Sequence, residues 1–179
     1  MRQENDGQYA PERLFIVDSP RYHVDGRQGA ADPSSDRGNC MVGIEKYLPH
    51  RPPFLFIDEV TIEGSTILAS RLYRDDEWFF KGHFPAHPVV PGVLLVEAMA
   101  QAGGVGVKLL GIQPDSMFVL AKIRSATFRR QVRPGDRLQM RVENIRSSSL
   151  IVHQKGTGMV EGEIAVEAEW IAMASGVPE

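Results

Sequence analysis

The feature that most constrains the fold of this chain is a long apolar segment, residues 91–110, which follows a loop rich in proline. Proline near the first position of a helix sacrifices no intrahelical hydrogen bond. The segment therefore predicts a helix that begins at Pro91 or Gly92 and ends near Leu110. Apolar residues occupy nearly every side of this helix. A helix of that kind has to be wrapped on most sides by other elements of the fold.

The same segment is too polar for a bilayer. Glu97, Gln101 and Lys108 interrupt the apolar run, and charged side chains are costly in hydrocarbon. We therefore expect a core helix and no membrane insertion.

Six other segments read as strands, and several of them alternate between apolar and polar residues with the period of two of a half-buried strand. These segments are residues 54–62, 65–73, 117–128, 137–145, 149–156 and 163–174. A turn at residues 133–136, with proline and glycine at its centre, predicts a chain reversal between the third and fourth strands. One enclosed helix with an antiparallel sheet of five or six strands makes the predicted fold class α+β.

Charge and cysteine content exclude several classes of function. The 179 residues contain 20 Lys and Arg against 23 Asp and Glu, a net charge of -3, whereas nucleic-acid binding needs clustered positive charge. The single cysteine, Cys40, excludes an intrachain disulfide and a metal site of several cysteines. The first residues lack the basic segment and apolar run of a secretory signal, so we expect a cytoplasmic protein.

The chain divides into two parts by composition. Residues 1–40 contain turn formers without a sustained apolar period, apart from residues 14–17, and predict a flexible N-terminal arm or extension. Structured character begins abruptly at Met41, which is a plausible alternative start. Residues 41–179 are the expected folded domain.

The loop before the helix and the helix itself carry the strongest chemical signal. Pro85, Pro88 and Pro91 hold the loop extended and stiff, which fixes His83 relative to the start of the helix. Glu97 lies in the second turn of an otherwise apolar helix, where an ionised carboxylate is costly without a partner. A loop histidine or a helix glutamate alone is more often structural or solvated. Together they predict a pair for proton transfer.

Metal ligation is a weaker interpretation of the same loop. His83 and His87 have the i, i+4 spacing that suits metal ligation on a helix, but Pro85 and Pro88 exclude a helix there. The sequence offers no third ligand, so we expect no metal site.

Three motifs in order resemble one known family. The segment GHFPAHPVVPGVLLVEAMAQ, residues 82–101, resembles the active-site segment of the FabZ-type (3R)-hydroxyacyl-[acyl carrier protein] dehydratases. YLPHRPPFLFIDEV, residues 47–60, resembles the family's opening segment, and residues 126–140 resemble its stretch that ends in PGD. The resemblance covers roughly residues 41–174. It implies the hot-dog fold, in which the sheet wraps the long helix, with dimers joined edge to edge and often a trimer of dimers.

The resemblance also implies roles for three residues. His83 matches the catalytic histidine and Glu97 the catalytic acid, contributed by opposite subunits, and Gly92 matches the glycine whose backbone N–H binds the thioester carbonyl. The implied reaction converts (3R)-hydroxyacyl-[acyl carrier protein] to the trans-2-enoyl thioester in fatty acid biosynthesis, without a cofactor. We assign removal of the C2 proton to His83 and protonation of the departing hydroxyl to Glu97. The related FabA-type enzymes, which also isomerise the double bond, have Asp at the position of Glu97, so dehydration alone is expected.

The chain departs from the family pattern at three positions. Ala86 replaces a common glycine, and Lys122 and Arg124 stand where glycine and aspartate are usual. The last two departures predict an altered acyl tunnel or subunit interface.

A local basic cluster offers a docking surface for the carrier protein. The cluster consists of Arg129, Arg130, Arg133 and Arg137. Acyl carrier proteins are acidic, and opposite charge steers such encounters. The alternative is a solvated strand-turn face with no partner.

Two other functions use the same fold. A hot-dog acyl thioesterase would release free thiol from an acyl thioester, and a non-enzymatic module would bind the acyl thioester without converting it. Enoyl formation and thiol release separate these alternatives from a dehydratase.

Overall fold

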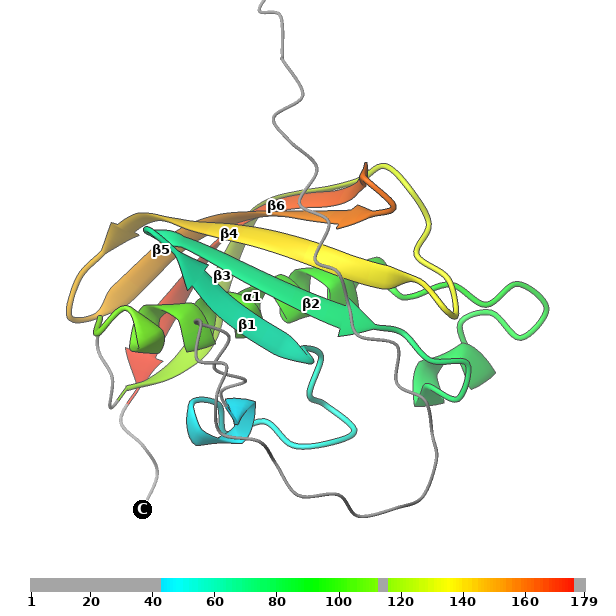
Figure 1. The fold of residues 1–179 in the computed structure, drawn as a ribbon, viewed down its shortest axis with the longest axis horizontal. Coiled ribbons are helices and arrows are strands. Elements are labelled where there is room, and N and C mark those ends of the chain that lie inside the picture. Colours follow the sequence, from blue (N-terminus) through cyan, green and yellow to red (C-terminus); the bar gives the residue numbers. More distant parts are fainter. Residues whose placement is uncertain (1–42, 113–115, 176–179) are drawn as a thin grey trace, which may run out of the picture. The chain divides into compact units, whose positions relative to one another are not determined.

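The computed structural model describes residues 43–112 and 116–175, so the predicted arm at residues 1–40 lies outside the described residues. The described part contains one α-helix, α1 (Gly92–Leu109), and the short 3-10 helices η1 (Ile44–Lys46) and η2 (Trp78–Lys81). Its strands are β1 (Glu59–Glu63), β2 (Thr66–Leu72), β3 (Met117–Phe128), β4 (Arg137–Ser147), β5 (Ile151–Val160) and β6 (Glu163–Ser175). Figure 1 shows these elements.

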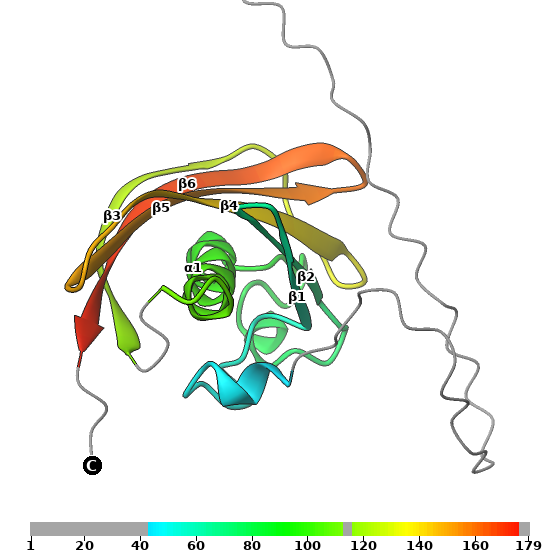
Figure 2. The same ribbon diagram turned by 60° about the vertical axis from the view of Figure 1, so that its left-hand side comes forward.

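The six strands form one antiparallel sheet in the order β1-β2-β4-β5-β6-β3. The sheet curves around α1, which lies along its concave face (Figure 2). This arrangement confirms the predicted α+β class and the hot-dog fold, with one long helix enclosed by a sheet.

Helix α1 is the centre of the core. By length and composition it could span a membrane, but 67% of its residues are buried inside the protein, as predicted for a core helix. Two glycines let the sheet approach it closely. A Cβ at Gly103 would lie 2.2 Å from Oε1 of Gln154, and one at Gly106 would lie 2.3 Å from Ile67. Glycine lowers helix propensity at both positions, but the absence of a Cβ allows the helix to pack closely against the sheet.

The predicted start of the first strand is wrong. Residues 54–58 were expected to pair, but β1 begins only at Glu59. The backbone of the preceding segment bonds to a helix side chain instead: the Phe56 N–H donates to Gln101 Oε1 at 2.9 Å, and Gln101 Nε2 donates to the Phe54 carbonyl at 3.1 Å. Gln101 thus satisfies two backbone groups of this segment in place of a neighbouring strand. The Asp58 N–H, next to β1, already donates to the Ser70 carbonyl of β2 at 2.8 Å.

The predicted turn between β3 and β4 is present. The N–H of Asp136 donates to the Arg133 carbonyl at 3.0 Å, and Gly135 has a φ of 87°, which favours glycine. The two strands that it connects are not neighbours in the sheet, because β3 pairs with β6 and β4 lies between β2 and β5.

The two edges of the sheet differ. Strand β1 has five residues and carries Glu59 and Glu63 on its exposed positions, whereas β3 has twelve residues and is exposed along most of its length. Val119, Ile123 and Phe128 of β3 are exposed apolar side chains. The register of β3 against β6 shifts twice, between Leu120 and Lys122 and between Ile123 and Ser125.

Candidate functional site

His83 lies in the loop between η2 and α1, and backbone bonds fix its position. Its N–H donates to the Phe79 carbonyl at 2.8 Å, and its carbonyl accepts from the Val89 N–H at 3.1 Å. The ring nitrogen Nδ1 is 3.0 Å from the Val89 carbonyl oxygen. Because a carbonyl oxygen can only accept, Nδ1 carries the hydrogen in this bond, and Nε2 of the neutral ring keeps a free lone pair. The loop therefore holds His83 in the tautomer that a base at Nε2 requires.

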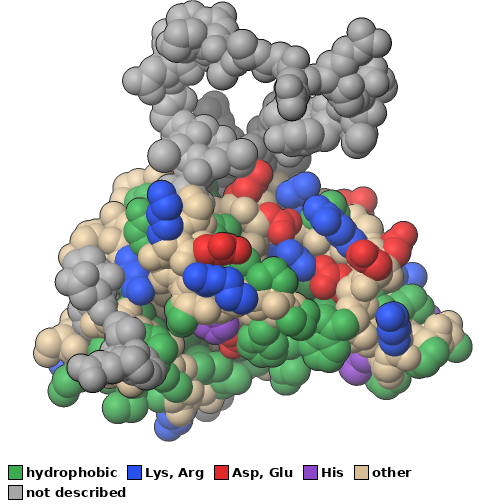
Figure 3. All heavy atoms as spheres, turned by 90° about the horizontal axis from the view of Figure 1, so that it is seen from below, with side chains coloured by type: hydrophobic (Ala, Val, Ile, Leu, Met, Phe, Trp, Pro, Cys, Tyr) green, Lys and Arg blue, Asp and Glu red, His purple; other side chains and the backbone are tan. Residues whose placement is uncertain are grey.

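An open apolar hollow surrounds His83. It is lined by Trp78, Phe79, Gly82, His83, Pro91, Val93 and Leu94. The ring of Phe84 stacks on the imidazole with centroids 4.2 Å apart, and Phe84, Trp78 and Val93 are exposed. In the view of Figure 3, hydrophobic side chains gather in the lower part of the surface, below a group of charged side chains. Such an exposed apolar patch is typical of a surface that binds an apolar ligand or another protein.

Glu97 lies on α1, with its side chain 20% exposed. Its Oε1 accepts a hydrogen bond from Gln101 Nε2 at 2.9 Å. His50 Nε2 lies 3.5 Å from the same oxygen. The carboxyl group is thus held by one partner on its own helix and approached by a second from the segment after η1.

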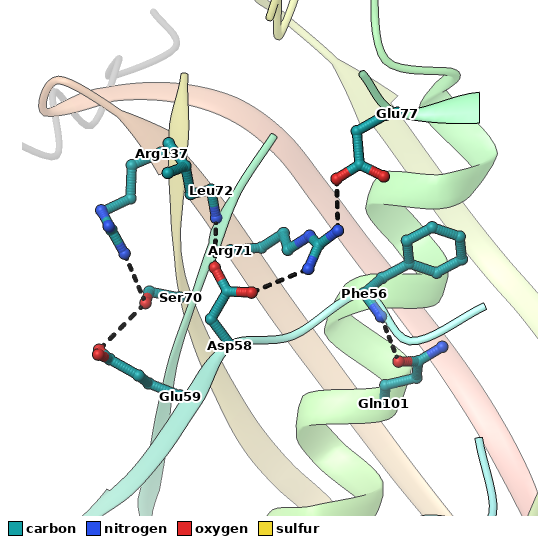
Figure 4. A network of polar contacts seen from close by, with 9 residues as sticks. All are labelled: Phe56, Asp58, Glu59, Ser70, Arg71, Leu72, Glu77, Gln101 and Arg137. Atoms are coloured by element: carbon teal, nitrogen blue, oxygen red, sulfur yellow. Dashed lines mark hydrogen bonds and ion pairs between the residues drawn. The ribbon is translucent and has the colours of Figure 1, made fainter. Parts of the chain in front are cut away.

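Gln101 links the helix to the segment before β1. Its side chain is 2% exposed and bonds to the backbone of Phe54 and Phe56 as well as to Glu97. Figure 4 shows the bond between Phe56 and Gln101. The side chain of Glu97 is therefore tied through Gln101 to a second segment of the chain.

A pocket of about 270 Å³ lies beside Glu97. It is lined by Tyr47, Leu48, Pro49, His50, Glu97, Ala100, Gln101, Gly104, Lys108, Met117, Phe118, Val119, Leu120 and Ala172. It shares no lining residue with the hollow at His83. In the described chain, the two predicted catalytic side chains thus line separate hollows.

Gly92 is the first residue of α1. Its N–H belongs to the first turn of the helix, where N–H groups have no intrahelical acceptor and where the helix dipole is positive. A Cβ at this position would lie 2.8 Å from Cε1 of Phe128 at the end of β3, so no larger residue fits unless that ring moves.

A polar network holds the chain that leads into the His83 loop. Arg71 pairs with Asp58 at 2.8 Å and also with Glu77, which immediately precedes η2 (Figure 4). Tyr73 packs nearby with no exposed surface, and burial raises the pKa of its hydroxyl. The Tyr73 hydroxyl has no hydrogen-bond partner among the described residues.

The arginine cluster is partly neutralised by acidic neighbours. Arg129 pairs with Glu167 at 2.6 Å. Arg130 pairs with Glu161 at 3.0 Å and with Glu163 at 3.4 Å.

The other two arginines bond to neutral side chains. Arg133 donates to Gln131 at 3.1 Å, and Arg137 donates to Ser70 at 3.3 Å. The four side chains therefore do not form one uncompensated basic patch.

The departures from the family pattern lie on the surface. Ala86 is exposed in the His83 loop, and Lys122 and Arg124 are exposed on β3. Arg124 pairs with Glu169 at 2.9 Å. Neither β3 residue lines the pocket at Glu97.

The described residues contain no group of three or more His, Cys, Asp or Glu side chains that could hold a metal ion. His87 Nε2 lies 3.2 Å from Gln131 Oε1.

Sequence reasoning missed the two neighbours of Glu97. The sequence identified Gln101 as a polar residue in an apolar helix and as the last residue of the family motif, but not as a partner of Glu97; their i, i+4 spacing is the signal that could have paired them. His50 gave no comparable signal, because its approach to Glu97 depends on how the segment after η1 folds back.

Comparisons with known proteins agree with the fold and these motifs. The family model described as the FabA-like domain matches residues 48–169. Among solved structures, the dehydratase heterocomplex ApeI:P from Xenorhabdus doucetiae has a TM-score of 0.64 at 19% identity, covering 74% of this chain and 90% of that one. A hypothetical thioesterase from Streptococcus pneumoniae with coenzyme A has a TM-score of 0.52 at 11% identity, covering 68% and 88%. These structures show the fold alone. Together with the family model, they place this chain in the class of hot-dog proteins with a FabA-like domain.

Curated relatives define the family more narrowly. The 3-hydroxyacyl-[acyl-carrier-protein] dehydratase FabZ of Anaeromyxobacter sp. (strain K) is 43% identical over 139 residues, which are 74% of this chain and 88% of the relative. FabZ of Aromatoleum aromaticum is 48% identical over 131 residues, covering 70% and 90%, and FabZ of Bacillus subtilis is 41% identical over 128 residues, covering 70% and 91%. This chain belongs to the FabZ family of 3-hydroxyacyl-[acyl-carrier-protein] dehydratases. The resemblance seen in the sequence, and the expected dehydratase class of fatty acid biosynthesis, are confirmed.

Proposed function

We propose that this protein converts (3R)-hydroxyacyl-[acyl carrier protein] to trans-2-enoyl-[acyl carrier protein] in the cytoplasm, with His83 as base and Glu97 as acid. The observation that carries this assignment is the bond between His83 Nδ1 and the Val89 carbonyl at 3.0 Å. That bond leaves the Nε2 lone pair free, and a neutral imidazole is a suitable base near neutral pH.

Dehydration requires a base that removes the proton from C2 and an acid that protonates the hydroxyl leaving C3. His83 Nε2 takes the proton from C2, and the electron pair of that C–H bond is delocalised onto the thioester oxygen before it forms the C2–C3 double bond. The C3–O bond breaks, and Glu97 gives its proton to the departing hydroxyl, which leaves as water. The Gly92 N–H, at the positive end of α1, stabilises the negative charge that develops on the thioester oxygen.

The site is completed between two subunits in this proposal. Two features support it: His83 and Glu97 line hollows with no common residue, and the long β3 edge carries exposed apolar side chains. Pairing of β3 with β3 of a second copy gives a homodimer, and we extend this to a trimer of dimers from the family resemblance.

Mixing of two inactive variants tests the shared site. His83→Ala and Glu97→Gln homodimers each lack one group at both sites, and each should lose about 10³-fold in kcat. A mixed dimer has one intact site and one doubly altered site. Unfolding the two variants and refolding them as an equal mixture should therefore restore about a quarter of the wild-type activity, because half of the dimers are mixed.

The readout is the absorbance of the enoyl thioester, with free thiol followed in the same reaction. Activity that stays absent in the refolded mixture, while wild type refolded alone is active, contradicts the shared site. Thiol release without enoyl formation contradicts the dehydratase and supports the thioesterase. Bound acyl thioester with neither product supports a binding module.

We also propose that the arginine cluster receives the acidic carrier protein. The ion pairs of Arg129 and Arg130 with glutamates reduce the charge available, so Arg133 and Arg137 are the main candidates. Replacing both by glutamate should raise KM for the carrier-bound substrate and leave KM unchanged for a small thioester analogue. Equal changes for both substrates would contradict docking at this cluster.

A further inference from the structure

Two glutamines are the buried polar side chains among the described residues, and they differ in what they contact. Gln101 and Gln154 are each 2% exposed, and both bond to groups of α1. Gln154 donates to the Gly103 carbonyl at 3.2 Å and to Asn144 Oδ1 at 2.8 Å, which are structural partners. Gln101 alone of the two bonds to a residue of the proposed site.

The backbone fixes which way the Gln101 amide points. The Phe56 N–H needs an acceptor and faces Oε1, and the Phe54 carbonyl needs a donor and faces Nε2. A flipped amide would place a donor against a donor and an acceptor against an acceptor. The remaining N–H of Nε2 therefore points at Glu97 Oε1, 2.9 Å away, and Gln101 always presents a donor to that carboxyl group.

We infer that Gln101 is a positioning residue for Glu97 and that its hydrogen bond gives the two carboxyl oxygens of Glu97 different roles. This inference rests on the proposed dehydratase function. Oε1 is the acceptor for Gln101 and is also the oxygen that His50 approaches. Oε2 is then the oxygen that carries the proton and gives it to the C3 hydroxyl. Hydrogen bonds to a charged acceptor are stronger than those to a neutral one. The Gln101 bond therefore strengthens as Glu97 loses its proton, which favours the transition state over the bound substrate.

The test compares matched variants of the two glutamines. Gln101→Met and Gln154→Met each remove a buried amide of similar size, so both should lower the melting temperature by comparable amounts. Only Gln101→Met should lower kcat, because only this change displaces Glu97. A displaced catalytic group lowers the rate by about 10-fold to 100-fold. KM should change less than about threefold, since Gln101 lines the pocket but acts through the acid and not through substrate affinity.

A second variant keeps the size of the side chain. Gln101→Glu can still accept from the Phe56 N–H, but its carboxyl group donates to Glu97 only when protonated. Its kcat relative to wild type should therefore rise as the pH falls from about 8 to about 6. The other titratable side chains that line this pocket are Tyr47, His50 and Lys108, and they are unchanged in both proteins. The melting temperature is measured at each pH, so that changes in folding are separated from changes in kcat.

The outcomes separate this inference from the function on which it rests. Wild type that forms no enoyl thioester overturns both. Active wild type with Gln101→Met and Gln154→Met equal in kcat overturns the positioning role and leaves the dehydratase standing. A pH-independent kcat ratio for Gln101→Glu, in protein that stays folded, also overturns the positioning role.

Discussion

The two edge strands of the sheet, β1 and β3, differ in length and in the side chains that they expose. Strand β1 is short and alternates exposed charged or polar residues with Val60 and Ile62, which face inward. Strand β3 is long, and apolar side chains such as Ile123 remain exposed on it. Short, charged edges protect a sheet from pairing, whereas a long apolar edge invites it. The difference in length and in exposed apolar residues supports the proposed pairing of β3, rather than β1, with a second copy.

The largest effect is expected from a charge on β3. Ile123→Lys should separate the proposed dimer, because its side chain is 45% exposed in one chain and would be buried in the pair. Activity per chain should fall at least about 10²-fold while the fold is retained, because the proposed site takes its two catalytic groups from different chains. Sedimentation and enoyl formation measure the two effects. A monomer with full activity would contradict the shared site, and Thr61→Lys on β1 serves as the control that leaves assembly unchanged.

The next effect is expected where β3 meets the start of α1. Gly92→Ala places a Cβ 2.8 Å from the Phe128 ring, and overpacking of this kind costs about 1–3 kcal/mol. The free energy of unfolding should fall accordingly, and kcat should fall with it because the helix N-terminus shifts. Urea unfolding and steady-state kinetics provide the measurements. Phe128→Ala in the same chain should restore stability to Gly92→Ala, and no restoration would mean that the ring is not the obstacle.

A core substitution on β1 should affect stability without affecting assembly. Val60 is 4% exposed, and Val60→Ala should lower the free energy of unfolding by about 1–2 kcal/mol through lost apolar burial. Urea unfolding followed by circular dichroism measures the change. If the oligomeric state changed as well, the contrast between the two edges would fail.

The smallest effect is expected on the solvent side in the middle of the sheet. Hydrogen bonds from Lys155 and, second, Arg141 hold the pKa of Glu143 below its ordinary value. The stability that these hydrogen bonds contribute is therefore present at neutral pH. It is lost as the pH falls through the lowered pKa that Glu143 has in the folded protein. Because Glu143 is largely solvated, Glu143→Gln should cost at most about 0.5 kcal/mol at pH 7. Unfolding curves at pH 7 and at successively lower pH measure it, and a difference from wild type that grows in acid would contradict this assignment.

Local signals in the sequence predicted the elements well. Helix α1 begins at Gly92 as expected from the proline-rich loop, and β3 spans the residues expected from its apolar pattern. The position of β3 beside β6 could not be predicted, because strand order depends on pairing between segments far apart in the chain. The start of β1 was missed for a related reason: the Phe56 N–H finds its acceptor on Gln101, 45 residues away.

The candidate site was predicted less completely than the fold. His83, Glu97 and Gly92 were selected by a stiff loop, a charge in an apolar helix and a family motif. The tautomer of His83 was not predictable, since it depends on where the loop brings the Val89 carbonyl. The approach of His50 to Glu97 depends in the same way on the path of residues 50–56, which the sequence does not determine.

The glycines that bring the sheet against α1 also tie the acid to the integrity of the whole domain. Gly103 and Gly106 weaken the helix on its own, and their contacts with Gln154 and Ile67 come from strands β5 and β2. An isolated helix of this composition would be largely unfolded, so no autonomous fragment can display Glu97 in its working geometry. At a protein concentration that keeps the proposed dimer assembled, loss of activity and loss of global structure on heating should therefore follow a single curve. An intermediate without the packed sheet should form no enoyl thioester.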